Sequence, residues 1–153
     1  MVLHQLQKLL KEVAVNKLKI DEMVIAAVDI LEKNSLSILE QGKVPSQYNS
    51  YLAAFGPSLV QTGLLQTVDF YSKKKSQEEK ERVKIIQLME KTLEKTGRIQ
   101  DKPPETSLSK YLKDSLGGGN FQRHITLKNY LMESCVACKL ALRTFPKKDK
   151  KNA

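Results

Sequence analysis

Residues 76–97 have the sequence SQEEKERVKIIQLMEKTLEKTG, and this stretch decides the fold class. Ser76 and Glu79 have the spacing of a capping box, in which each side chain accepts a hydrogen bond from the other residue's backbone N–H. Apolar residues then recur at intervals of three and four, as on one face of an α-helix: Val83, Ile86, Met89 and Leu93. Acidic residues crowd the first turn, and Gly97 supplies a stop. The stretch therefore predicts a helix with both ends defined.

Helical spacing continues toward the N-terminus. It predicts one helix over residues 3–13 and a second over residues 20–38. Asp21 and Glu22 would stand in the first turn of the second helix, where negative charge favours the helix dipole. Gly42 is expected to take the left-handed conformation that ends this helix.

The next segment contains glycine and proline at informative positions. We expect Ser46 to cap a short helix that Gly56 and Pro57 break, since proline suits the first position of the helix after it. That following helix is predicted to run to about Lys75, with Gly63 in its interior. A glycine inside a helix costs about 1 kcal/mol relative to alanine, so a neighbouring helix is expected to cross closely at Gly63.

The C-terminal third predicts two further helices. A loop containing two prolines leads to a short helix over residues 107–116, and Gly117–Gly119 separates it from a long helix over residues 127–145. No alternating strand pattern competes. The prediction is an all-α, single-domain bundle of about six helices over residues 1–146, followed by a basic, disordered tail over residues 147–153.

The charge of the chain is positive and uneven. Its 153 residues include 26 Lys plus Arg and 17 Asp plus Glu, a formal net charge of +9. Residues 1–76 carry nine basic and seven acidic side chains, whereas residues 77–153 carry seventeen and ten. A basic excess concentrated in one half indicates a polyanionic partner, most often a nucleic acid.

Other features of composition indicate a cytoplasmic protein. No stretch approaches the ~20 apolar residues of a membrane-spanning helix, and the N-terminus lacks the unbroken apolar centre of a secretory signal. Two cysteines are too few for a disulfide framework, which agrees with a reducing compartment. We therefore expect no membrane partner.

Cys135 and Cys138 have the CxxC spacing that zinc sites and dithiol redox sites use. A structural zinc site needs four nitrogen or sulfur ligands, and the chain has no third cysteine. Both thiols also belong to one apolar stripe of the last predicted helix: Leu127, Leu131, Cys135, Cys138, Leu142 and Phe145. Burial in the core is the preferred interpretation. A zinc-bridged or redox-active dimer is the alternative.

Other motifs that carry chemistry are weak. Gly117-Gly118-Gly119-Asn120 lacks the further residues of a phosphate-binding loop and is better interpreted as a hinge. No serine stands in a nucleophile-elbow pattern. Asp69 has no evident partner for paired acid–base chemistry, and neither do the two histidines. We therefore expect no enzymatic activity, no metal and no cofactor.

The basic residues carry the functional prediction. On a helical wheel of the last predicted helix, Lys128, Lys139 and Arg143 fall on one side, beside the apolar stripe. A positive face of this kind can follow a phosphate backbone, because each neutralised phosphate releases counterions. Few aromatic residues are present, so backbone contact is favoured over base stacking. The predicted nucleic-acid contacts are Lys19, Lys73, Lys74, Lys75, Lys139, Arg143, Lys147 and Lys148.

The segment Leu52–Tyr71 resembles the small subunit of type III-B CRISPR effector complexes, the Cmr small subunit. The resemblance is carried by an apolar run ahead of Gly63-Leu64-Leu65-Gln66-Thr67 and by Val68-Asp69-Phe70 after it. The family places this segment on a central helix. Weaker matches are Ala26-Ala27, and Glu133 with Arg143 in the last helix.

The resemblance implies a non-catalytic scaffold in prokaryotic antiviral defence. Such subunits stack in a filament along a complex that carries crRNA, and they help to hold the crRNA–target RNA duplex while other subunits cut the RNA. The implied partners are crRNA, target RNA, the other Cmr subunits and further copies of the chain. The alternative is a helical protein–protein adaptor whose charge serves solubility alone.

Overall fold

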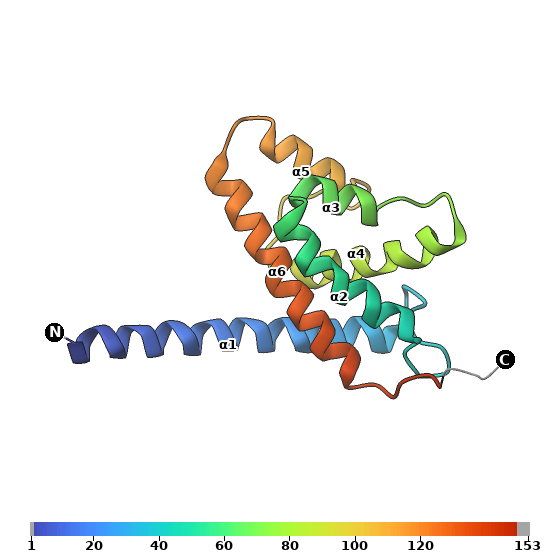
Figure 1. Ribbon diagram of the computed structural model, residues 1–153, viewed down its shortest axis with the longest axis horizontal. Coiled ribbons are helices and arrows are strands. Elements are labelled where there is room, and N and C mark those ends of the chain that lie inside the picture. The colour runs from blue at the N-terminus through green and yellow to red at the C-terminus, as the bar shows by residue number, and fades with distance from the viewer. Residues whose placement is uncertain (1, 150–153) are drawn as a thin grey trace.

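The computed structural model describes residues 2–149, without the side chains of residues 9–18. Within that range the elements are six α-helices (Figure 1): α1 (Val2–Lys33), α2 (Ser46–Gln61), α3 (Leu64–Tyr71), α4 (Gln77–Lys95), α5 (Leu108–Leu116) and α6 (Phe121–Arg143). The only β-type pairings among these residues are two isolated bridges. The predicted all-α, single-domain bundle is confirmed.

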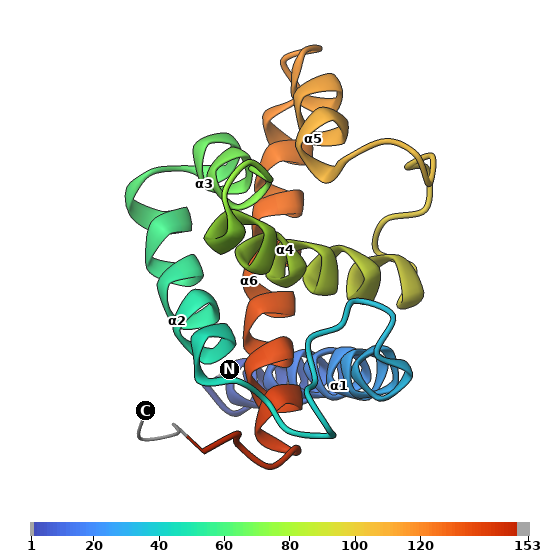
Figure 2. The same cartoon turned by 90° about the vertical axis from the view of Figure 1, so that its right-hand side faces the viewer.

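Helix α6 occupies the centre of the bundle. It packs against α1, α2, α4 and α5, and α3 packs against α2, α4 and α5. Figures 1 and 2 show α1 crossing α6 near one end, with α5 at the other end. Buried apolar side chains come from all six helices, so they share one core. The N-terminal end of α1 projects away from the other helices (Figure 1), and Val2, Leu3 and Leu6 are exposed there.

The prediction of two helices before Gly42 was wrong, because α1 is one continuous helix. No glycine or proline interrupts the chain between residues 13 and 20, so nothing ends the first predicted helix. The helix ends at Lys33, and Asn34 takes the left-handed conformation at φ 53°. The Asn34 amide exchanges two 3.0 Å hydrogen bonds with the backbone of Leu39. Asn34 is therefore the left-handed residue that ends the helix, the role expected of Gly42. Gly42 lies in a later turn with φ 76°.

The predicted break at Gly56 and Pro57 was also wrong. Pro57 lies inside α2, and the break comes at Gly63, which precedes α3 with φ 104°. Proline has no backbone N–H, so Pro57 cannot donate a helical hydrogen bond to the carbonyl of Ala53. Ala53 is exposed, so water can bind that carbonyl instead. Gly63 is thus not a mid-helix glycine under a crossing helix. Its left-handed conformation is one that other residues rarely adopt, and it divides the family-like segment between α2 and α3.

The N-terminus of α4 is confirmed as a capping box. Ser76 accepts a hydrogen bond from the Glu79 N–H at 3.1 Å, and Glu79 accepts one from the Ser76 N–H at 2.9 Å. At α2, by contrast, the N-cap is Pro45 rather than Ser46, and it makes no side-chain capping bond. The predicted cap at Ser46 was therefore wrong.

These two serines form a matched pair for a stability test. Ser76→Ala is expected to lower the free energy of unfolding by about 1 kcal/mol, because it removes a capping acceptor. Ser46→Ala is expected to change it by less than about 0.5 kcal/mol, because that side chain caps nothing. Urea unfolding followed by circular dichroism measures both variants. Equal losses for the two variants would contradict the assignment of the caps.

Lys102 lies buried in the segment between α4 and α5. Its side chain is 1% exposed, and its ammonium group lies 3.0 Å from the Glu90 carboxylate of α4. The ammonium also donates to the backbone carbonyls of Thr106 at 2.7 Å and Pro103 at 3.3 Å. Lys102 thus links the segment to α4 through Glu90, and it links two parts of the segment through the Pro103 and Thr106 carbonyls.

The chain after α6 lies against the segment that connects α1 and α2. The Val44 N–H donates to the carbonyl of Pro146 at 2.8 Å, and the Lys148 N–H donates to the carbonyl of Val44 at 2.9 Å. Of the predicted tail, residues 150–153 lie outside the described residues. None of the described helices is long and apolar enough to cross a membrane.

Candidate nucleic-acid interface

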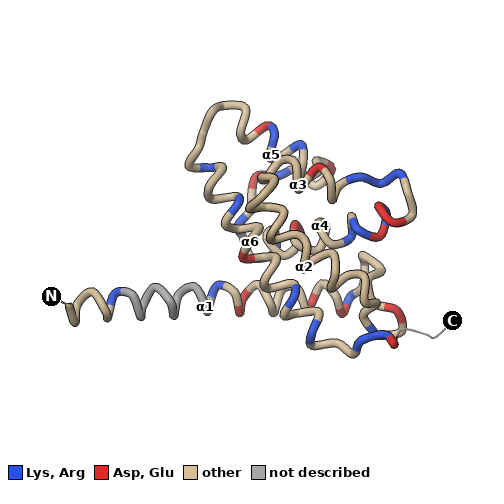
Figure 3. Tube along the Cα trace, viewed as in Figure 1, with Lys and Arg blue, Asp and Glu red and all other residues tan. Residues whose placement is uncertain are grey.

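The eight predicted cations lie in three separate places. Lys19 is on α1, and Lys73, Lys74 and Lys75, here called the loop cluster, connect α3 to α4. Lys139 and Arg143 on α6, with Lys147 and Lys148 just after it, are here called the C-terminal cluster. In Figure 3 the basic segment between α3 and α4 is well separated from the basic segment that follows α6. The structure therefore groups seven of the cations into two surface clusters rather than one.

The loop cluster is positioned by structure on both sides. Before it, the Ser72 hydroxyl donates to the carbonyl of Val68 at 2.6 Å. After it, the Lys75 N–H donates to the Glu79 carboxylate at 3.2 Å, beside the capping box. These backbone bonds, the one from Ser76 first, hold the pKa of Glu79 below its usual range. All three lysine side chains are exposed.

The C-terminal cluster combines a helix face with a tethered strand of chain. Lys139 and Arg143 are four residues apart and so lie on the same side of α6. Lys139 is half-buried and Arg143 is exposed. Lys148 forms an ion pair with Glu40, which precedes the Val44 bridge. The backbone bonds to Val44 therefore hold Lys147 and Lys148 close to the connection between α1 and α2.

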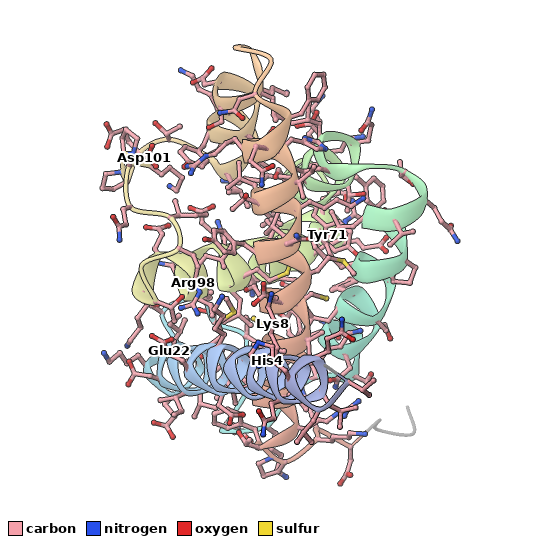
Figure 4. All side chains as sticks on the ribbon, turned by 90° about the vertical axis from the view of Figure 1, so that its left-hand side faces the viewer. His4, Lys8, Glu22, Tyr71, Arg98 and Asp101 are labelled. Atoms are coloured by element: carbon pink, nitrogen blue, oxygen red, sulfur yellow. The ribbon has the colours of Figure 1, made fainter. Side chains whose placement is uncertain are left out.

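Most of the predicted cations have no carboxylate partner. Only Lys148 of the eight lies within 4.0 Å of a carboxylate oxygen of another described side chain. Elsewhere carboxylates are paired: Glu22 with Arg98, for example, joins α1 to the chain after α4 at 3.3 Å (Figure 4). Positive charge at the two clusters is thus left available to a ligand.

Asp69, for which the sequence suggested no partner, is a connecting residue. It accepts a hydrogen bond from the Ser109 hydroxyl of α5 and lies 3.2 Å from the Lys113 ammonium group. The Ser109 bond is the largest cause that lowers the pKa of the Asp69 carboxyl. Asp69 therefore joins α3 to α5 as a carboxylate. Sequence alone could not reveal this role of Asp69, because Ser109 lies forty residues further along the chain.

The two cysteines are buried, as the core interpretation predicted. Cys135 and Cys138 are 2% and 0% exposed, and the Cys135 thiol donates to the carbonyl of Leu52 at 3.4 Å. Burial raises the pKa of Cys138 to about 12, so its thiol stays protonated. The stripe around them is also confirmed, with Phe145 only partly buried. Residues Gly117–Gly119 form the turn between α5 and α6.

These features define a class: a small all-α protein with two basic surface clusters and a core that includes both its cysteines. A family model described as CRISPR-associated protein (Cas_Cmr5) matches residues 26–118, more than half of the chain. The chain belongs to this family and is a small subunit of type III-B CRISPR complexes. No curated protein and no solved structure matches it.

The family match divides the two clusters. It contains the loop cluster and the motif from Gly63 to Phe70, and it ends at Gly118, before α6. Lys19 and the C-terminal cluster lie outside the matched residues. Family membership implies association with the other subunits of the complex. It assigns no role to either cluster.

Proposed function

We propose that this chain is a non-catalytic scaffold that holds the crRNA–target RNA duplex through its phosphate backbone. The contacts come from the loop cluster, the C-terminal cluster and Lys19. The observation that carries the proposal is that seven of these eight cations have no carboxylate within ion-pair distance among the described side chains. Exposed ammonium and guanidinium groups of this kind neutralise phosphates and release condensed counterions. The target strand is the RNA that such complexes recognise in antiviral defence.

The engagement of two carboxylates near the loop cluster, Glu79 and Asp69, supports a scaffold role. Glu79 is held by backbone N–H groups at a helix end, and Asp69 is held by Ser109 and Lys113. Both have a pKa below the usual range, so each stays ionised at neutral pH. A general acid needs the opposite shift, toward neutrality. These side chains stabilise the fold rather than transfer protons.

An exposed apolar patch supports stacking of copies or of neighbouring subunits. Val60 of α2 is 66% exposed, and Val136 and Leu140 of α6 are 43% and 39% exposed. Pro57, Met132 and Val136 line a shallow hollow between the two helices. Apolar side chains that gather in this way on a surface are typical of protein–protein contacts. Lys139, one of the proposed phosphate contacts, also lines this hollow. We therefore propose this face of α2 and α6 for a contact between adjacent subunits that lies beside the bound RNA.

A salt titration tests the phosphate contacts. Replacing Lys73, Lys74 and Lys75 together by glutamine is expected to weaken binding of single-stranded RNA to a similar degree for every RNA sequence. The plot of log affinity against log salt should become shallower by about 2, since each lost contact removes about 0.7 from the slope. Fluorescence anisotropy at several salt concentrations measures both quantities, with the full chain alone and in the assembled complex.

The control removes the same charge elsewhere. Lys8, Lys33 and Lys91 are exposed lysines outside both clusters, and their combined replacement by glutamine is expected to leave the slope nearly unchanged. Equal effects of the two triple variants would mean that net charge alone attracts the RNA. If the wild-type protein binds no RNA in low salt, in either form, the chain is an adaptor whose charge serves solubility.

A further inference from the structure

Phe70 is an apolar side chain that the fold leaves in water. It lies near the C-terminal end of α3, three residues before Lys73 of the loop cluster, and it is 48% exposed. Its neighbour Tyr71 is 3% exposed and lies in the core. Phe70 therefore presents part of an aromatic ring to solvent next to three exposed lysines.

Cations surround this ring. The guanidinium carbon of Arg82 lies 3.9 Å from the ring centroid, and the ammonium group of Lys73 lies 5.8 Å from it. Asp69, which precedes Phe70, is already bound by Ser109 and Lys113. Arg82 also lies 3.9 Å from the Glu79 carboxylate, so the uncompensated positive charge near the ring comes from Lys73 and the rest of the loop cluster. This charge favours a polyanion over an apolar protein segment as the ligand of the ring.

The ring is also held in place from beneath. Arg82 is 9% exposed, and its terminal nitrogen donates to the carbonyl of Phe70 at 3.3 Å. The Nε atom of Arg82 is buried without a hydrogen-bond partner among the described atoms, while a terminal nitrogen lies 3.9 Å from the Glu79 carboxylate and the guanidinium carbon lies over the Phe70 ring. Tyr71 meets the Phe70 ring edge-on at 5.9 Å, and the Tyr71 hydroxyl donates to the carbonyl of Tyr51. A ring fixed in this way loses little freedom when a ligand stacks on it.

We propose that Phe70 is a stacking site for one unpaired base of single-stranded RNA, with the flanking phosphates on the loop cluster. Every base has a π-face, so such a site accepts RNA of any sequence. With Arg82 on one side and the base on the other, the ring lies between a guanidinium plane and a nucleobase. This site rests on the proposed function, since the same loop contacts the phosphates, and it takes a base that lies outside the base-paired part of the bound RNA.

The test compares Phe70→Leu with Phe70→Tyr. Leucine keeps an apolar side chain over Arg82 and removes the aromatic face. It is expected to weaken binding of a single-stranded RNA by about 5- to 150-fold, which corresponds to the ~1–3 kcal/mol of one base–aromatic stack. Phe70→Tyr keeps the face and should bind within about twofold of the wild type. An RNA carrying 2-aminopurine should lose fluorescence on binding to the wild type and less on binding to Phe70→Leu.

Phe121→Leu is the matched control. Phe121 is even more exposed, at 81%, but begins α6 with no run of lysines beside it, so its replacement should leave binding unchanged. If Phe70→Leu binds as tightly as the wild type and 2-aminopurine keeps its fluorescence, the stacking site is overturned. The salt titration of the lysine variants then still decides the phosphate contacts separately. If the wild type binds no RNA in any form, both proposals fall together.

Discussion

Replacement of Lys102 by methionine is expected to lower the free energy of unfolding by about 3 kcal/mol. The Lys102 ammonium group is buried against Glu90, and its removal leaves a largely buried carboxylate without its partner. The Thr106 carbonyl would also lose a 2.7 Å hydrogen bond. Urea unfolding followed by circular dichroism measures the loss. A loss below about 1 kcal/mol would show that the segment between α4 and α5 is held by other contacts.

A double variant and a pH series identify the cause. Lys102→Met with Glu90→Gln removes the unpaired charge and is expected to recover about half of the loss or more. Burial raises the pKa of Glu90, so the folded protein retains a proton that the unfolded chain releases as pH increases. Without Lys102, which opposes that shift, the pKa rises further. The deficit of Lys102→Met should therefore be smaller near pH 5 than near pH 8, and a deficit independent of pH would contradict this mechanism.

The second large effect is expected from Phe55→Ala in α2. Phe55 is 0% exposed, and its ring meets Tyr71 edge-to-face with centroids 5.0 Å apart. Truncation leaves a cavity where α2 packs on α3, so the free energy of unfolding should fall by about 3–5 kcal/mol. That is a large fraction of the ~5–15 kcal/mol by which domains of this kind are stable.

A second truncation to alanine in α2, at an exposed position, serves as the control. It shows whether the loss comes from the buried cavity or from a change in the stability of the helix α2. Val60 is 66% exposed, so Val60→Ala should change the free energy of unfolding by less than about 0.5 kcal/mol. Urea unfolding of both variants gives the comparison. A small loss for Phe55→Ala would mean that α2 and α3 close together over the missing ring.

The elements that sequence predicted well are those with signals inside the element. Helix α4 has its capping box, its apolar stripe and its glycine stop within 22 residues, and all three are present in the structure. Errors arose where one residue type can act in two ways. The pattern predicts a helix start at Pro57, which lies inside α2, and a helix interior at Gly63, which lies at a break. Which role a glycine or proline takes depends on packing that sequence does not display.

For the candidate interface, sequence identified the cations but not their surroundings. Exposed lysines can be recognised from composition and position, and the two clusters follow from chain connectivity. The engagement of Asp69 by Ser109, and of Phe70 by Arg82, joins residues 40 and 12 positions apart. In the sequence Phe70 is recognisable only as part of a motif, because helical spacing cannot tell an exposed ring from a buried one. These contacts are products of tertiary packing, which local patterns do not encode.

The central position of α6 has a consequence for the order in which the chain matures. Four other helices rest on α6, yet it is the last of the six to leave the ribosome. Until then α4 already has α1, α2 and α3 to pack against, but the apolar side chains of α1, α2, α4 and α5 that contact α6 remain uncovered. Completion of the core is therefore a late event, delayed until translation of the described helices is finished.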